Sequence, residues 1–81
     1  MNLKLIEGEF TVNDALELIT KMVHVKIKYH ENKITSNNSE EDIKLRESKI
    51  KKLQNELFDL RNSLDEKQVN LKLEAIIKIE K

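Results

Sequence analysis

Two long segments of the chain repeat their hydrophobic residues every three or four positions, which is the spacing of an α-helix. The first segment runs from about residue 12 to residue 34, and the second from about residue 40 to residue 67. Between them, the polar cluster TSNNS at residues 35–39 marks a turn. The chain has one glycine and no proline, so nothing else interrupts either segment. The pattern predicts two helices joined by one short turn.

Each predicted helix begins with a hydroxyl residue that can cap its first turn. Thr11 stands three residues before Asp14, and Ser39 stands three residues before Asp42. A hydroxyl in this position accepts a hydrogen bond from a backbone N–H of the first turn, which has no partner inside the helix. The two helices are therefore expected to begin directly after Thr11 and Ser39.

The two helices differ in the width of their apolar faces. The second carries a narrow stripe at heptad positions, broken only by Arg46, which suits contact with one partner helix. The first carries two adjacent stripes that cover about half of its circumference, so two surfaces are needed to cover it. The hairpin core is expected to comprise Val12, Leu16, Ile19, Val23, Ile27, Ile43, Ile50, Leu53, Leu57, Leu60 and Leu64. The second stripe of the first helix comprises Ala15, Leu18, Met22, Val25 and Tyr29.

Both ends of the chain alternate apolar and polar residues, which is typical of strands. The predicted strands cover residues 2–10 and 69–80, and the tetrapeptide NLKL occurs in both. In the first strand the alternation shifts at Ile6 and Gly8, which predicts a bulge or bend. Because a helical hairpin brings the chain ends together, the strands can pair antiparallel. We expect one α+β domain, residues 1–81, of β-α-α-β order, with a coiled-coil-like hairpin backed by this small sheet across the second stripe of the first helix.

The composition limits the classes of partner. Fifteen Lys and Arg residues balance fifteen Asp and Glu residues, so no global field attracts nucleic acid or an anionic membrane. Nowhere do eighteen apolar residues run together, and the N-terminal segment lacks the apolar run of a signal peptide. The absence of cysteine excludes disulfides and thiol chemistry. The expected location is cytoplasmic, with nucleic acid an unfavoured partner and no membrane contact.

Few residues are candidates for chemistry. His24 and His30 are six residues apart and project about 120° from each other on a helix, so they cannot share one metal ion. We expect His30 to contact Glu31 or Arg46, and Lys26 and Arg46 to form ion pairs across the hairpin with Glu47 and Glu31. A small two-layer domain offers little concavity, and a single glycine allows no phosphate-binding loop. No catalytic, cofactor or metal site is expected, so the protein is not predicted to be an enzyme.

The wide apolar face of the first helix and the open edges of a two-stranded sheet predict self-association. We expect a protein–protein interaction or scaffolding module that forms homo-oligomers, most simply a two-fold dimer, with another protein as a further possible partner. The contact between the copies is expected to use either the edge of the sheet or the first helix. The expected interface residues are Ala15, Leu18, Met22, Val25, Tyr29, Ile6 and Ile76.

The alternative function is a small nucleic-acid-associated regulator that uses the lysines of the second helix, Lys44, Lys49, Lys51 and Lys52. These lysines also have a simpler explanation as a solvated face. Pairs of opposite charge stand four residues apart in the favourable order at Glu40 and Lys44, at Asp42 and Arg46, and at Glu47 and Lys51.

Overall fold

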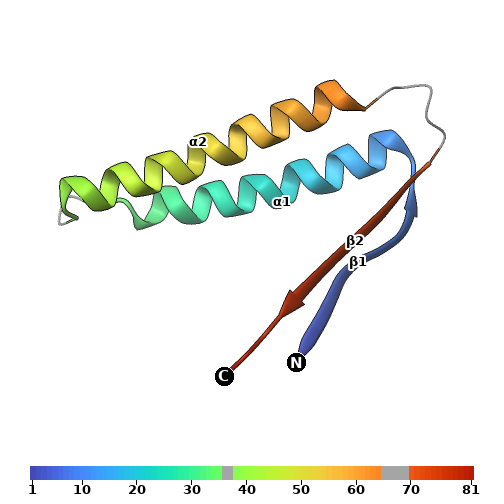
Figure 1. Cartoon of the computed structure of the whole chain (residues 1–81), viewed down its shortest axis with the longest axis horizontal. Helices are drawn as coiled ribbons and strands as arrows, with labels where there is room; N and C mark the ends of the chain where they lie inside the picture. Colours follow the sequence, from blue (N-terminus) through green and yellow to red (C-terminus); the bar gives the residue numbers. More distant parts are fainter. Residues whose placement is uncertain (36–37, 65–69) are drawn as a thin grey trace.

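The computed structural model describes residues 1–35, 38–64 and 70–81. Its elements are β1 (Asn2–Phe10), α1 (Val12–Lys33), α2 (Glu40–Ser63) and β2 (Leu71–Lys78), and the two strands form one antiparallel sheet (Figure 1). This layout confirms the predicted α+β class and β-α-α-β order. The helix α2 ends at Ser63, whereas the sequence predicted an end near residue 67. Residues 65–69, which contain the end of that predicted helix and the start of the predicted second strand, lie outside the described residues.

Both predicted helix starts are confirmed by their caps. The hydroxyl of Thr11 accepts a hydrogen bond from the backbone N–H of Asp14 at 3.1 Å, and the hydroxyl of Ser39 accepts one from that of Asp42 at 3.2 Å. Both capping residues have extended backbone angles, so each marks a sharp change from extended chain to helix. For α1 this change follows immediately after β1, because Thr11 alone separates the strand from the helix.

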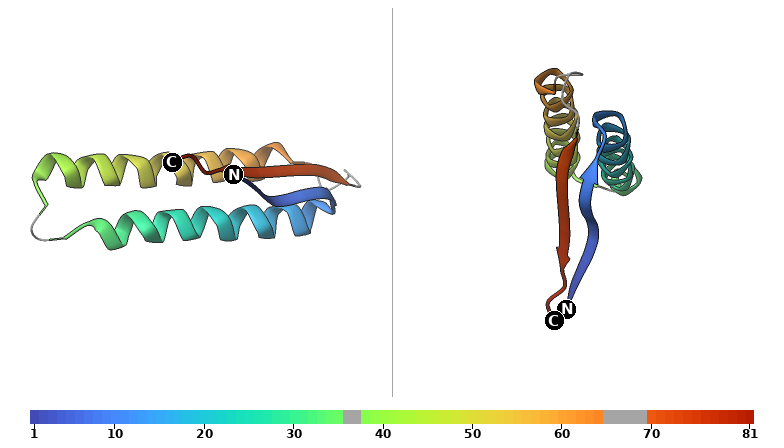
Figure 2. Two further views of the ribbon diagram at one scale, coloured as in Figure 1. Left: turned by 90° about the horizontal axis from the view of Figure 1, so that it is seen from below. Right: turned by 90° about the vertical axis from the view of Figure 1, so that its right-hand side faces the viewer.

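The two helices pack side by side as an antiparallel hairpin (Figures 1 and 2). Val12, Ile27 and Leu57 are buried, and the other eight predicted core residues are half-buried. His30 is also buried within this seam. One polar contact crosses the hairpin toward the strand end, where the Arg61 guanidinium donates to the Thr20 hydroxyl at 3.1 Å. The hairpin core is thus thin, since two helices that meet along one seam leave the rest of each helix exposed.

The strands form a two-stranded ribbon with one irregularity. Phe10 pairs with Leu71 near the helices and Leu3 pairs with Ile77 near the free end, and the register shifts between Lys4 and Ile6. Gly8 has a φ of 135°, a conformation that residues with a Cβ rarely adopt. The predicted bulge or bend in the first strand is therefore confirmed. Because the strands are antiparallel, the two NLKL segments lie at opposite ends of the ribbon.

The ribbon leans away from the helices. In Figures 1 and 2 it leaves the hairpin at the start of α1 and diverges from it, so the molecule has the shape of a V with both chain ends at the free tip of the ribbon. The expectation that the sheet backs the whole second stripe of α1 is wrong. Ala15 is fully buried near the apex, but Val25, ten residues further along the stripe, is 71% exposed. The single residue between β1 and α1 fixes the angle of the strand, and pairing then holds β2 beside it.

This geometry makes the chain extended for its size. The radius of gyration is 15.6 Å, whereas a compact domain of this length has a value of about 12 Å. The principal extents are 48 × 33 × 13 Å, so the molecule is flat as well as open.

A first prediction concerns the hairpin seam. Leu57→Ala should lower the free energy of unfolding by about 2 to 5 kcal/mol, because it removes a buried side chain and leaves a cavity between the helices. Lys51→Ala is the control, since Lys51 is exposed on the same helix and its removal should change stability by less than about 0.5 kcal/mol. Urea unfolding curves measure both. Equal losses for the two variants would contradict the assigned seam.

A second prediction concerns the ribbon, in which Glu7 and Glu74 are directly opposite each other. Like charges in this position destabilise a pair of strands. Glu74→Lys should therefore raise the free energy of unfolding by about 0.2 to 1 kcal/mol, because it converts a repulsive pair into an attractive one. Glu74→Gln removes the repulsion alone and should give a smaller gain. A loss of stability in both variants would show that Glu74 makes a favourable contact instead.

Candidate functional site

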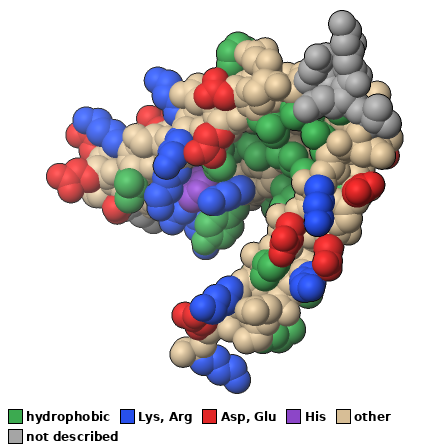
Figure 3. All heavy atoms as spheres, turned by 45° about the vertical axis from the view of Figure 1, so that its right-hand side comes forward, with side chains coloured by type: hydrophobic (Ala, Val, Ile, Leu, Met, Phe, Trp, Pro, Cys, Tyr) green, Lys and Arg blue, Asp and Glu red, His purple; other side chains and the backbone are tan. Residues whose placement is uncertain are grey.

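The ribbon and the helices enclose an apolar groove near the apex of the V. The groove has a volume of about 320 Å³ and takes side chains from all four elements. Its apolar lining includes Ile6, Ile19, Met22, Val23, Leu53 and Leu73. Figure 3 shows this patch of hydrophobic side chains between the hairpin and the ribbon. The apolar groove is the part of the V where the two arms still lie close enough to share a surface.

Beyond the groove, the second stripe of α1 loses its cover. Ala15 is fully buried and Leu18 is half-buried, but Met22 at the border of the groove and Val25 and Tyr29 beyond it are exposed. The two predicted interface residues on the strands differ from each other. Ile6 is half-buried in the groove, whereas Ile76 is exposed opposite Lys4. The predicted interface residues are therefore divided among three places. These are the buried apex, the exposed part of α1 from Met22 to Tyr29, which we call the open arm of α1, and the ribbon.

The face of the ribbon that continues from the groove is also apolar. Ile6 pairs with Ala75 and Phe10 pairs with Leu71, and all four are half-buried. Toward the free end the same face continues with Leu3 and its partner Ile77, which are 43% and 44% exposed. Side chains alternate between the two faces of a strand, so Ile79 follows Ile77 on this face. Sequence reasoning did not include these three residues in the interface, because it assumed that α1 would cover them.

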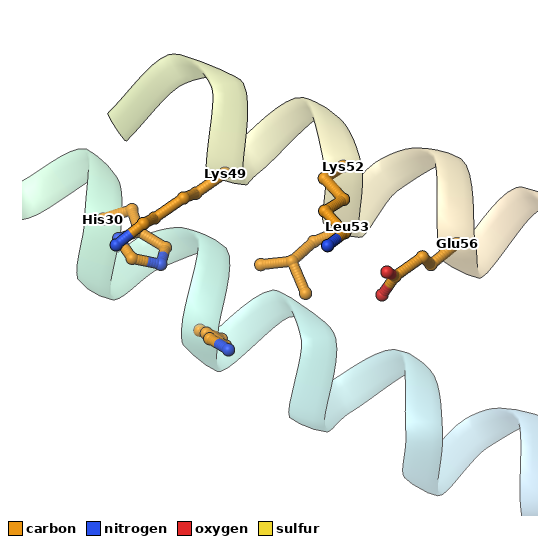
Figure 4. A pocket seen from close by; sticks show the side chains of 6 residues that line it. His30, Lys49, Lys52, Leu53 and Glu56 are labelled. Atoms are coloured by element: carbon orange, nitrogen blue, oxygen red, sulfur yellow. The ribbon is translucent and has the colours of Figure 1, made fainter. Parts of the chain in front are cut away.

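A basic pocket lies beside the groove on the same side of the hairpin. Its volume is about 260 Å³, and Lys26, His30, Lys49, Lys52, Leu53 and Glu56 line it. Lys26 and Leu53 also line the apolar groove, so the two sites are continuous. Figure 4 shows Lys49 extending from α2 toward His30 on α1, with Leu53 between the two helices. The inner side of the hairpin thus changes from apolar near the apex to cationic further out.

His30 is the most constrained polar group of this pocket. Its Nδ1 lies 3.0 Å from the Arg46 guanidinium, which confirms the predicted contact between these residues. Because a guanidinium can only donate, Nδ1 accepts this bond and the imidazole proton resides on Nε2. Nε2 is buried and has no hydrogen-bond partner among the described residues. Burial, followed by the positive charges of Arg46, Lys49 and Lys26, lowers the pKa of His30, so the ring favours its neutral form.

The other predicted charge contacts are not formed within the described residues. Arg46 contacts His30 instead of Glu31, and Lys26 does not pair with Glu47. None of the three predicted pairs on α2 is present in the described part of that helix. An ion pair that was not predicted joins Glu17 and Lys21 at 2.8 Å on α1, and it lowers the pKa of Glu17 and raises that of Lys21. Exposed pairs of this kind add little stability.

The four lysines of the alternative function do not share one site. Lys49 and Lys52 line the basic pocket, whereas Lys44 and Lys51 line a separate depression with Glu47. The division follows from the helix, because residues two positions apart lie on different sides of it. Lys49 and Lys52 share their pocket with one cation of α1, Lys26, whereas the residues that line the second depression all come from α2.

A third prediction follows from the buried imidazole. The lowered pKa of His30 means that the unfolded chain binds a proton more readily than the folded one, so stability should fall as the pH drops below about 6.5. Urea unfolding between pH 5.5 and 7.5 measures this slope. His30→Gln should flatten it, and His24→Gln, at an exposed position of the same helix, should leave it unchanged. An identical slope in all three proteins would assign the pH dependence to other groups.

Among the described residues, no three His, Cys, Asp or Glu side chains form a group that could hold a metal ion. The described helices also include none that is both long and apolar enough to cross a bilayer. Comparisons with protein-family models, curated proteins and solved structures find no match to the chain. The function must therefore be argued from the apolar groove, the exposed faces that continue from it and the basic pocket.

Proposed function

We propose that the protein is a non-enzymatic interaction or scaffolding module that forms a homo-oligomer, most simply a dimer. One observation carries this proposal. The chain exposes 6888 Å², whereas a folded monomer of its mass exposes about 5,100 Å². The surplus is about 1,800 Å², and a specific interface of standard size buries about 800 Å² on each partner. Homodimers with larger interfaces bury more, so the surplus is of the size that a permanent dimer covers.

The nature of the exposed surface supports the same conclusion. The open arm of α1 and the free half of the ribbon both present apolar side chains, which are costly to leave in water. Contiguous apolar patches of this kind on soluble proteins mark sites of association. The ribbon also has two unpaired edges, and a pair of strands is only marginally stable by itself. A second copy would cover these faces without any other component.

The chemistry of the pocket favours binding over catalysis. The residues that line the basic pocket include cations and one carboxylate, but neither a hydroxyl nor a thiol nucleophile. The buried imidazole of His30 is held between cationic groups and, among the described residues, contacts no carboxylate that could orient it as a base. A cytoplasmic location remains a prediction from the cysteine-free composition.

The basic pocket favours one alternative, a small nucleic-acid-associated regulator. Lys49 and Lys52 of α2 join Lys26 of α1 there, so a phosphate would meet three ammonium groups. Binding to nonspecific DNA at increasing salt tests this alternative, because each phosphate contact steepens the salt dependence. The zero net charge of the chain gives no long-range attraction to DNA, which is why the interaction module is preferred.

A fourth prediction tests the oligomer and its route. Light scattering at micromolar concentration should give at least twice the monomer mass, and Met22→Lys should reduce it if the first helix forms the interface. Ile76→Lys should do so if the outer face or edge of the ribbon forms it. Asn55→Lys, at an exposed position of α2 away from both, is the control and should leave the mass unchanged. A monodisperse, cooperatively folded monomer would defeat the proposal.

A further inference from the structure

Two apolar faces extend from the apex of the V, and both lose their cover at a similar distance from it. On the ribbon, Leu3 lies roughly 20 Å from Phe10 at the rise of a strand. On α1, thirteen residues at 1.5 Å each cover the same roughly 20 Å, from Val12 to Val25. Leu3 and Ile77 on one arm, and Val25 on the other, are all exposed. The free half of the ribbon and the open arm of α1 are thus both apolar, and both become exposed at a similar distance from the apex.

The apolar groove is too small to hold a second ribbon. Its volume of about 320 Å³ is enough for a few side chains. An added element must therefore lie further from the apex, where the arms diverge (Figure 1). On α1, Val25 and Tyr29 are exposed beyond the groove, and Met22 is exposed at its border. An element that covers the open arm of α1 there must have an apolar face about as wide as a strand or a two-stranded ribbon. The chain itself carries one such face, formed by Leu3, Ile77 and Ile79.

We propose that two copies exchange ribbons, so that the free half of each ribbon packs against the Met22, Val25 and Tyr29 stripe of the other copy's α1. This inference rests on the proposed homo-oligomer and specifies its geometry. The two V-shaped chains meet mouth to mouth around a two-fold axis, and each contributes one helix face and one ribbon face. Such a contact is isologous, because the same two surfaces are used on both subunits.

The surface area favours a second copy as the occupant over closure of each V on itself. Closure within one chain would cover the inner faces but would leave the rest of a flat, 13 Å thick molecule exposed on both sides. The surplus of about 1,800 Å² per chain, obtained from the exposed 6888 Å², is the amount that one subunit of a large homodimer buries. An unrelated protein is not needed to account for it.

Cross-linking between single cysteines tests the arrangement, since the natural chain has no cysteine. Ile77→Cys and Val25→Cys chains of different tag length are refolded together and treated with a short bismaleimide. In this mixture a cross-link between the two variants can form only between chains. The control is a mixture of Lys72→Cys and Val25→Cys chains, because Lys72 lies on the opposite face of the ribbon. We expect the yield of the Ile77–Val25 cross-link to be at least about ten times that of the control.

Every other outcome contradicts the exchange, and each one points to a different arrangement of the chain. Equal yields for the Lys72 control, from a chain that light scattering shows to be a dimer, would retain the oligomer and refute this geometry. A double Ile77→Cys, Val25→Cys chain that cross-links internally, while the mixture does not, would show that the V closes within one chain. A monomer without either cross-link would defeat both proposals and leave the stripe for a different protein. The exchange also requires Met22→Lys to dissociate the dimer and Ile76→Lys to preserve it.

Discussion

The antiparallel pairing of the two chain ends is the constraint on which the rest of the structure depends. Backbone bonds connect β1 to β2 from Phe10 and Leu71 as far as Asn2 and Lys78, and Met1 and Ile79 extend the pairing with two further hydrogen bonds of 2.7 and 3.0 Å. The ribbon holds its shape through these bonds and takes little support from the helices beyond the apex. Its direction is set by the single residue Thr11 between β1 and α1. Pairing and this short junction together leave two apolar faces uncovered.

The order of the elements and the starts of the two helices could be predicted from the sequence. Thr11 and Ser39 were identified as caps because a hydroxyl three residues before an acidic residue satisfies a free N–H of the first turn. For His30, a contact with Glu31 or Arg46 was expected from its place near the turn, and the structure forms the contact with Arg46. The caps and this contact lie at helix starts or near the turn, so residue identity and spacing along the chain indicate them.

The angle between ribbon and hairpin could not be obtained in the same way. A hydrophobic pattern shows that a face will avoid water, but it does not show which surface covers that face. The alternation of Leu3, Ile77 and Ile79 was visible in the sequence and was assigned to contact with α1 of the same chain. The exposed fractions of these residues show that this contact is absent beyond the apex. The three ion pairs predicted for α2 are not formed in its described part, because exposed charges gain too little from pairing to fix one geometry.

The inner side of the hairpin combines two surfaces with different demands on a partner. The apolar groove gains free energy when water is excluded, whereas the basic pocket beside it holds cations that lose hydration when they are covered. An element that covered both would have to present apolar side chains near the apex and acceptors or anions further out. In the proposed exchange, the ribbon of the second copy would present Leu3 and Ile77 as the apolar side chains and would stay on the Met22, Val25 and Tyr29 stripe. The lysines at the edge can then keep their ammonium groups in water, as their long apolar stems allow. The pocket therefore borders the proposed contact and limits how far over α2 a partner extends.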